Sequence, residues 1–108
     1  MVFYAEFTPM ALNDIDETVD YIGNILDNHI AAKRFYDEVK KYRSYIERNP
    51  YMYALYHDDE MAADGCRYAL VGNYIMLYTI NEDNKTINII RVIYGGRDIS
   101  KAYNEQFN

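Results

Sequence analysis

The sequence predicts an α+β fold of two layers, in which an N-terminal strand and a helical hairpin pack on a mainly antiparallel sheet. Three observations predict it. Apolar residues repeat at helical spacings through the first half of the chain. After Gly65 they occur instead in short runs separated by turn residues. The link between the two helical segments is short, so the helices form an antiparallel hairpin. We expect residues 1–108 to form a single domain with the order β-α-α-β-β-β.

The N-terminal segment predicts a strand followed by an amphipathic helix. Residues 2–7 are aromatic and β-branched, which favours a strand. Thr8 is a suitable N-cap, and Pro9 suits the first helical position. The apolar stripe of the helix is expected at Leu12, Ile15, Val19, Ile22 and Leu26. Its exposed face is expected to carry Asp14, Asp16, Glu17, Asp20 and Asp27.

A second helix is predicted to begin after Asn28, a plausible cap, and to end at Asn49-Pro50, because the residue before proline avoids the helical region. Its apolar stripe is Ala32, Phe35, Val39, Tyr42 and Ile46. Its exposed face carries Lys33, Arg34, Lys40, Lys41, Arg43 and Arg48. We expect the stripes of both helices to face each other and the sheet.

The second half of the chain predicts three strands joined by tight turns. Residues 51–64 are expected to form a loop that ends in an acidic run. The strand segments are CRYAL, YIMLYTI and TINIIRVIY, separated by Gly72-Asn73 and by NEDNK. After Gly95-Gly96, the segment RDISKAYNEQF is expected to form one or two helical turns.

Composition excludes several classes of protein. Eleven basic and seventeen acidic residues give a net charge of −6, which disfavours a protein that binds nucleic acid mainly through phosphates, including sequence-specific DNA binding. Cys66 is the only cysteine, so no internal disulfide forms. Neither His29 nor His57 has a partner at metal-binding spacing, and no cofactor motif occurs, so we expect neither a metal nor a cofactor. Since no signal peptide or membrane-spanning segment is apparent, the cytoplasm is the default compartment.

One group of residues has the chemistry of a phosphodiester site. Arginine gives bidentate contacts to phosphate, and tyrosine can act as an acid or base or stack on a nucleobase. The candidates are Arg67, Arg91, Arg97 and Tyr103. The alternative is a structural role, in which arginines beside the sheet pair with Asp98, Glu82 or Asp83.

The order and spacing of several segments resemble the RelE/ParE superfamily of toxins from bacterial type II toxin–antitoxin modules. The resemblance spans about residues 2–104 and rests on YAEFTPMALNDIDETVDYI, AAKRFYDEV, the Asn49-Pro50 helix end, CRYALVGNYIMLYTI and INIIRVIYGGRD. It implies a small antiparallel sheet packed on a helical hairpin, in agreement with the fold predicted from the residues.

The superfamily contains two functional branches. RelE-like members are ribosome-dependent mRNA endonucleases, whereas ParE-like members are linked to inhibition of DNA gyrase. Arg97 and Tyr103 fit the arginine–tyrosine spacing of the nucleases. Ile75, however, stands where those nucleases carry an arginine, and the stretch DDEMAAD lacks their lysines and offers only Glu60 as a candidate base. The resemblance therefore favours the ParE branch.

We expect a ParE-like toxin that inhibits growth by binding a protein target, with DNA gyrase a candidate, and that is neutralised by a cognate antitoxin. The basic face of the second helix is the expected site for acidic antitoxin residues. The residues in question are Lys33, Lys40, Lys41 and Arg43. Two alternatives remain open. One is a metal-independent mRNA endonuclease that acts on the ribosome and uses Arg67, Arg91, Arg97 and Tyr103. The other is a toxin-derived domain that has lost toxicity.

Overall fold

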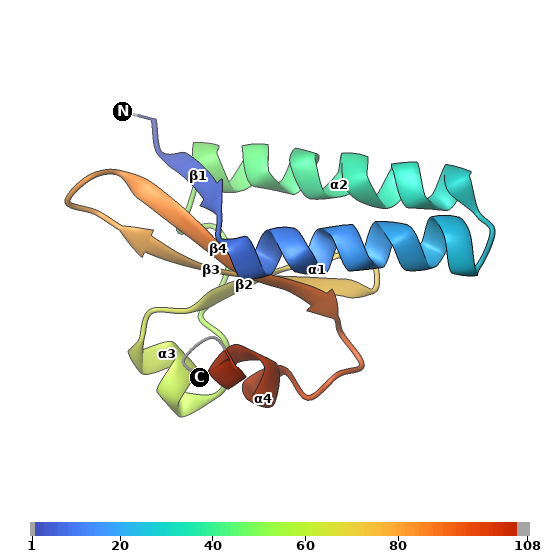
Figure 1. The fold of residues 1–108 in the computed structure, drawn as a ribbon. Helices are drawn as coiled ribbons and strands as arrows, with labels where there is room; N and C mark the ends of the chain where they lie inside the picture. The colour runs from blue at the N-terminus through green and yellow to red at the C-terminus, as the bar shows by residue number, and fades with distance from the viewer. Residues whose placement is uncertain (1, 106–108) are drawn as a thin grey trace.

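A four-stranded sheet lies between a long helical hairpin and two short helices in the computed structural model, which describes residues 2–105 (Figure 1). The elements are β1 (Tyr4–Phe7), α1 (Pro9–Asp20), the π-helical turn η1 (Tyr21–Ile25), α2 (His29–Arg48), α3 (Asp59–Ala63), β2 (Arg67–Val71), β3 (Tyr74–Asn81), β4 (Thr86–Tyr94) and α4 (Ile99–Asn104). The predicted α+β fold and the order β-α-α-β-β-β are confirmed. None of the helices in the described part of the chain is long and apolar enough to cross a membrane.

The strand order is β1-β4-β3-β2. β2, β3 and β4 form an antiparallel meander, and β1 pairs in parallel with the first half of β4, from Thr86 to Ile89. The pairing of β3 with β4 shifts between Leu77 and Tyr78, which leaves Ile90 as an extra residue on β4. Beyond Ile89, β4 has no strand beside it on the β1 side, so that edge needs other hydrogen-bond partners.

The start of α1 is as predicted, but its buried face is different. The Thr8 hydroxyl accepts a hydrogen bond from the Ala11 N–H, and Pro9 occupies the first turn. Leu12 and Leu26, predicted to be in the apolar stripe, are 49% and 55% exposed, whereas Asp14 is buried. The helix is rotated so that the side with Asp14 meets the unpaired edge of β4. Since successive helical residues are about 100° apart, this rotation turns Leu12 outward.

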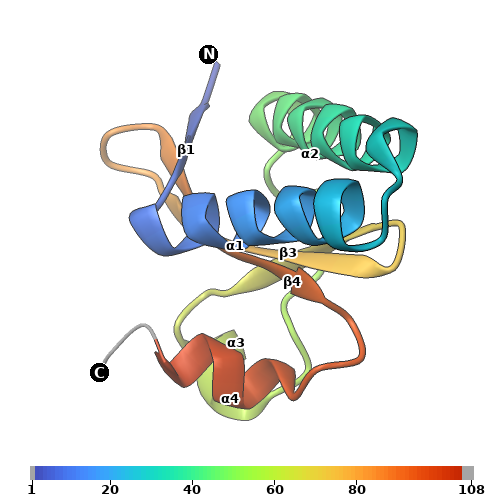
Figure 2. The same ribbon diagram turned by 45° about the vertical axis from the view of Figure 1, so that its right-hand side comes forward.

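The second helix follows the prediction closely. The Asn28 side chain accepts a hydrogen bond from the Ala31 N–H, and the helix ends at Arg48, two residues before Pro50. The buried residues of α2 are Ala32, Phe35, Val39 and Ile46, and Tyr42 packs beside them in part. The hairpin arrangement of α1 and α2 is clear when the molecule is turned (Figure 2).

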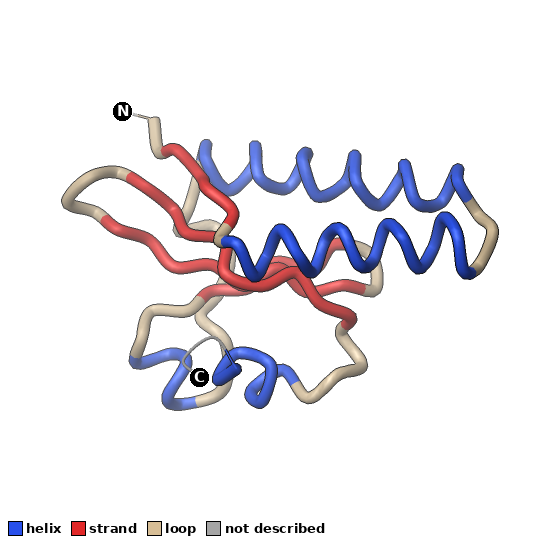
Figure 3. The backbone as a smooth tube through the Cα atoms, viewed as in Figure 1, coloured by secondary structure: helices blue, strands red, loops and turns tan. Residues whose placement is uncertain are grey.

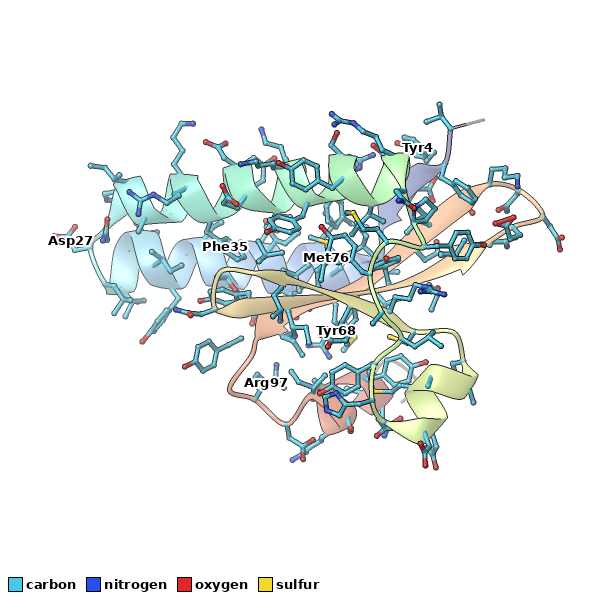
Figure 4. All side chains as sticks on the ribbon, turned by 180° about the vertical axis from the view of Figure 1, so that it is seen from behind. Tyr4, Asp27, Phe35, Tyr68, Met76 and Arg97 are labelled. Atoms are coloured by element: carbon cyan, nitrogen blue, oxygen red, sulfur yellow. The ribbon has the colours of Figure 1, made fainter. Side chains whose placement is uncertain are left out.

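Each face of the sheet has its own apolar core. The hairpin-side core consists of Ala5, Ala11, Ile15, Phe35, Val39, Ile46, Ala69, Val71, Met76, Tyr78, Ile87, Ile89 and Val92. The far-side core consists of Tyr56, Met61, Cys66, Ile75, Leu77, Ile90, Ile93, Ile99, Ala102 and Tyr103. Figure 4 shows Phe35 and Met76 on the α2 side of the sheet and Tyr68 on the other side.

The segment predicted as a loop before β2 contains the short helix α3 (Figure 3). The Asp58 carboxylate caps α3 by accepting from the Glu60 and Met61 N–H groups, and Met61 is buried. Asp58 also accepts from the Ser100 hydroxyl of α4 at 2.6 Å. α3 and α4 therefore form one small layer over the far side of the sheet, and the helical turns predicted at the C-terminal end are present as α4.

Candidate functional site

Arg91, one of the predicted nuclease residues, is buried and fully engaged. Its side chain is 4% exposed. Its Nε and Nη2 donate to the two carboxylate oxygens of Asp14 at 2.8 and 2.9 Å, and its Nη1 donates to the Ala102 carbonyl at 2.6 Å. The hydrogen bond with Asp14 raises the pKa of Arg91. A guanidinium held in this way joins α1, β4 and α4 and does not present its donors to a phosphate in solvent.

The unpaired edge of β4 explains this ion pair. The Thr8 hydroxyl donates to the Ile90 carbonyl, and Asp14 accepts the Val92 N–H at 3.0 Å in addition to the two bonds from Arg91. α1 thus satisfies backbone groups that β1 would have bonded had it been longer. The prediction that Asp14 lies on the exposed face is wrong for this reason.

Tyr103 is also turned inward. It is 3% exposed, and its hydroxyl donates to the Asp64 carboxylate at 2.6 Å. Burial and the hydrogen bond to Asp64 raise the pKa of Tyr103. A phenol that keeps its proton and donates it in a hydrogen bond to a neighbouring carboxylate is poorly suited to act as a base towards RNA.

Arg67 and Arg97 lie in other surroundings. Arg67 is opposite Tyr78 and so points to the hairpin side, whereas Arg91 is opposite Leu77 of the far-side core. Arg67 donates to the Tyr53 carbonyl at 2.7 Å. Arg97 follows β4 and is exposed (Figure 4). It pairs with Glu105 at 3.1 Å. The structure therefore does not gather the four residues Arg67, Arg91, Arg97 and Tyr103 into one cluster.

The residues predicted to bind the antitoxin lie along α2, and each has an acidic neighbour on the same helix. The pairs are Lys33–Asp37 at 2.8 Å, Lys40–Asp37 at 3.9 Å, Lys41–Glu38 at 3.8 Å and Arg43–Glu47 at 3.8 Å. The three lysines are exposed, whereas Arg43 is half-buried over the rings of Tyr4 and Phe7. Six basic and three acidic residues on α2 leave this surface with a net charge of +3.

A groove runs between α1–η1 and the ends of β3 and β4. Its volume is about 720 Å³. Three tyrosines line it, Tyr21, Tyr74 and Tyr94, together with the carboxylates of Glu17 and Asp20. One feature of the sequence points to this groove: the first helix carries several acidic residues and no lysine or arginine that could pair with them.

Within residues 2–105, no three histidine, cysteine, aspartate or glutamate side chains gather closely enough to hold a metal ion.

Comparison with known families and structures decides the family. The model described as "ParE toxin of type II toxin-antitoxin system, parDE" matches residues 5–99. The chain belongs to the ParE toxin family. It is therefore a toxin of the type II toxin–antitoxin class within the RelE/ParE superfamily, which confirms the resemblance seen in the sequence. A search of curated proteins finds no match.

Three solved structures share the fold of this ParE-family toxin. A chain of the toxin–antitoxin complex RelBE2 from Mycobacterium tuberculosis is 22% identical with a TM-score of 0.66, covering 87% of this chain and 99% of that one. A chain of the chromosomal ParDE system from P. aeruginosa is 15% identical with a TM-score of 0.68, covering 85% and 95%. A chain of the archaeal RelE–RelB complex from Pyrococcus horikoshii OT3 is 16% identical with a TM-score of 0.61, covering 90% and 99%. At these identities the likeness establishes the fold.

Proposed function

We propose that this ParE-family toxin arrests growth in the cytoplasm by binding a protein target, with DNA gyrase the first candidate, and that a cognate antitoxin neutralises it. The observation that carries the proposal is the enclosed Arg91–Asp14 pair. A metal-free ribonuclease needs a base near the 2′-hydroxyl, an acid near the leaving oxygen and cations for the transition-state charge. Arg91 and Tyr103 are committed to partners inside the protein instead.

The charge of the molecule supports the same conclusion. A ribosomal target site surrounds its ligand with phosphates, and a protein of net charge −6 gains little from them. Ile75, the position at which the nucleases carry an arginine, is an apolar residue buried in the far-side core. The site therefore has no cation from that strand position.

An antitoxin partner is supported by the three structural neighbours, each of which comes from a toxin–antitoxin system. We assign acidic antitoxin residues to the basic surface of α2, formed by Lys33, Lys40, Lys41 and Arg43. Reversing the charge of Lys40 and Lys41 should slow association and reduce its dependence on salt. An unchanged association rate would place the antitoxin elsewhere.

The mechanism is tested by induced expression followed by two assays. We expect induction to arrest growth. We also expect the toxin to leave mRNA intact on programmed ribosomes and to inhibit supercoiling by purified gyrase. Substitutions at Arg97 should then weaken binding of the target, and their effect should not appear in any chemical step. If growth continues on induction, the chain is a domain that has lost toxicity.

The second candidate function is mRNA cleavage, favoured by the exposed Arg97 and by Tyr103 six residues further on. In that case the wild-type protein cuts mRNA on ribosomes, and Arg97→Ala and Tyr103→Phe each abolish cutting. That result would overturn the proposed mechanism. For Tyr103 to take part in cleavage, its hydrogen bond to Asp64 would have to open when the toxin binds the ribosome.

A further inference from the structure

Three tyrosines beside the C-terminal half of α2 form a cluster that the proposed function does not use. Tyr42 and Tyr45 come from α2, and Tyr53 comes from the segment that follows it. The centroid of the Tyr42 ring lies 5.4 Å from that of Tyr45 and 6.4 Å from that of Tyr53. All three side chains are only partly buried, so this tyrosine cluster presents part of its aromatic surface to solvent.

The hydroxyls of the tyrosine cluster make no hydrogen bond to any other residue within 2–105. The nearby Tyr78 differs, because its hydroxyl donates to the Pro50 carbonyl at 2.6 Å. Burial, followed by the neighbouring phenols of Tyr42 and Tyr45, raises the pKa of Tyr53. The three phenols therefore lie close together, and no described residue accepts a hydrogen bond from them.

Exposed apolar side chains accompany the tyrosine cluster. Tyr51 is 50%, Met52 52% and Leu55 43% exposed, and they belong to the segment that also supplies the third tyrosine of the cluster. This segment is held at the edge of β2, where the Tyr68 N–H donates to the Ala54 carbonyl at 3.1 Å. Tyrosine and methionine are enriched at protein interfaces, so this surface has the composition of an interaction site.

The chemistry of the tyrosine cluster indicates the kind of ligand that fits it. Aromatic faces and hydroxyl donors match a ligand with apolar rings and unpaired acceptors. A proline-rich segment has both, because proline lacks a backbone N–H and the polyproline II helix leaves its carbonyl groups without internal hydrogen bonds. The carbonyls of an α-helical segment are bonded within the helix except at its C-terminal end. Single-stranded nucleic acid is disfavoured by the net charge of −6.

We propose that the tyrosine cluster binds a proline-rich segment of a partner protein, with proline rings on Tyr42, Tyr45 and Tyr53 and the phenol hydroxyls donating to carbonyl groups of the segment. Several classes of recognition domain bind proline-rich segments on aromatic-lined surfaces, where the preformed polyproline II helix loses little conformational entropy. The proposal is independent of the proposed function, because the chemistry of the cluster alone defines the ligand.

The first test compares three probes by titration into isotope-labelled toxin, followed through amide chemical shifts. The first probe is an uncharged peptide of about ten residues in which every third residue is leucine and the others are proline. The second is the same peptide with serine in place of proline, and the third is a single-stranded oligothymidine of about ten nucleotides. The proline peptide should bind, with shift changes in the C-terminal half of α2 and in residues 51–55.

Three outcomes of this titration would overturn the proposal. The proline peptide could fail to bind, or the serine peptide could bind equally well. In the third outcome, the oligothymidine binds this surface more tightly than the proline peptide, and the cluster is then a nucleic-acid site.

The second test removes single hydroxyls and keeps the rings. Tyr42→Phe, Tyr45→Phe and Tyr53→Phe should each weaken binding of the proline peptide about two- to tenfold, the effect of losing one hydrogen bond. Tyr36→Phe is the matched control. It makes the same change at an exposed tyrosine of the same helix, whose ring lies under the Lys40 ammonium at 4.8 Å. The control should leave the affinity unchanged. Equal weakening by Tyr36→Phe and Tyr42→Phe, or full affinity in all three cluster variants, would show that the hydroxyls do not bind the peptide.

Discussion

The two helices of the hairpin are attached to the same sheet by different interactions. α2 lies over the face of the sheet and is held by Phe35, Val39 and Ile46. α1 lies at the unpaired edge of β4 and is held in part by the buried carboxylate of Asp14, which bonds to Arg91 and to a backbone N–H. A helix on a sheet face needs only apolar side chains, whereas a helix at an open sheet edge must also supply hydrogen-bond partners.

The outer surfaces of the two helices differ as well. The acids of α2, Asp37, Glu38 and Glu47, each have a lysine or arginine partner on the same helix. The exposed acids of α1 have no such partner on that helix, and two of these carboxylates, Glu17 and Asp20, line the groove beside η1. The hairpin therefore places two surfaces of opposite charge on one domain.

The largest effect is expected from breaking the apolar attachment of α2. Val39→Asp would place a carboxylate at a position that is 1% exposed, and we expect a loss of roughly 4 kcal/mol or more, comparable to the whole stability of a small domain. Urea unfolding followed by circular dichroism measures it. Arg34→Asp, an exposed site without an ion pair among the described residues, should change stability by less than about 0.5 kcal/mol. A Val39→Asp protein that unfolds like the parent would contradict this placement of α2.

The polar attachment of α1 is tested at Asp14. Asp14→Ala leaves Arg91 charged and buried, so we expect a cost of about 3–5 kcal/mol. Asp16→Ala, an exposed site on the same helix, should cost less than about 0.5 kcal/mol. The double variant Asp14→Ala/Arg91→Ala should be less destabilised than the sum of the single variants, because neither charge remains unpaired. Additive costs would show that the ion pair does not hold α1.

A smaller effect is expected at the polar contact that α2 makes with β1. Glu47 accepts the Ala5 N–H at 2.9 Å, and Glu47→Ala should cost about 1–2 kcal/mol because that N–H loses its partner. Glu38→Ala on the same helix is the control, with an expected change below about 0.5 kcal/mol. Chemical denaturation of the three proteins gives the values. If Glu47→Ala costs as much stability as Asp14→Ala, polar contacts hold α2 as strongly as they hold α1.

The smallest effect, and a stabilising one, is expected where the two helices touch. Gly23 of η1 is buried against α2, and a Cβ placed there would lie 3.4 Å from the Ala32 Cβ and 3.4 Å from a ring nitrogen of His29. Gly23→Ala should therefore raise stability by up to about 1 kcal/mol, because alanine loses less backbone entropy on forming a helix. Thermal unfolding measures the shift. A lower melting temperature would mean that the hairpin contact has no room for a methyl group.

The same comparison explains what the sequence could predict. The stripe of α2, including Phe35 and Val39, was predicted correctly because apolar contact with a sheet face leaves a periodic pattern in the sequence. The buried face of α1 was not predicted correctly, because the sequence does not distinguish Asp14 from its exposed neighbours Asp16 and Glu17. The need for a buried carboxylate arises only because β1 ends at Phe7. Beyond that point β4 has no neighbouring strand on this edge, and its N–H groups need another hydrogen-bond acceptor.

The candidate nuclease cluster shows the same limit. The sequence places Arg67 and Arg91 on strands of one predicted sheet but does not give their positions relative to each other. Which face of the sheet each arginine occupies depends on the register of β3 with both of its neighbours and on the shift at Leu77 and Tyr78. A shift of one residue exchanges the two faces, and nothing in the sequence marks its position.

The single cysteine of the chain lies in the far-side core, and its burial has a practical consequence. Burial and the charge of Asp64 raise the pKa of the Cys66 thiol to about 12, so at neutral pH the thiolate that reacts with alkylating agents and oxidants is almost absent. Reaction then requires that the layer formed by α3 and α4 open. The rate at which Cys66 is alkylated therefore records how often this layer opens, without any engineered label. A binding partner that holds the layer closed should slow that reaction in proportion.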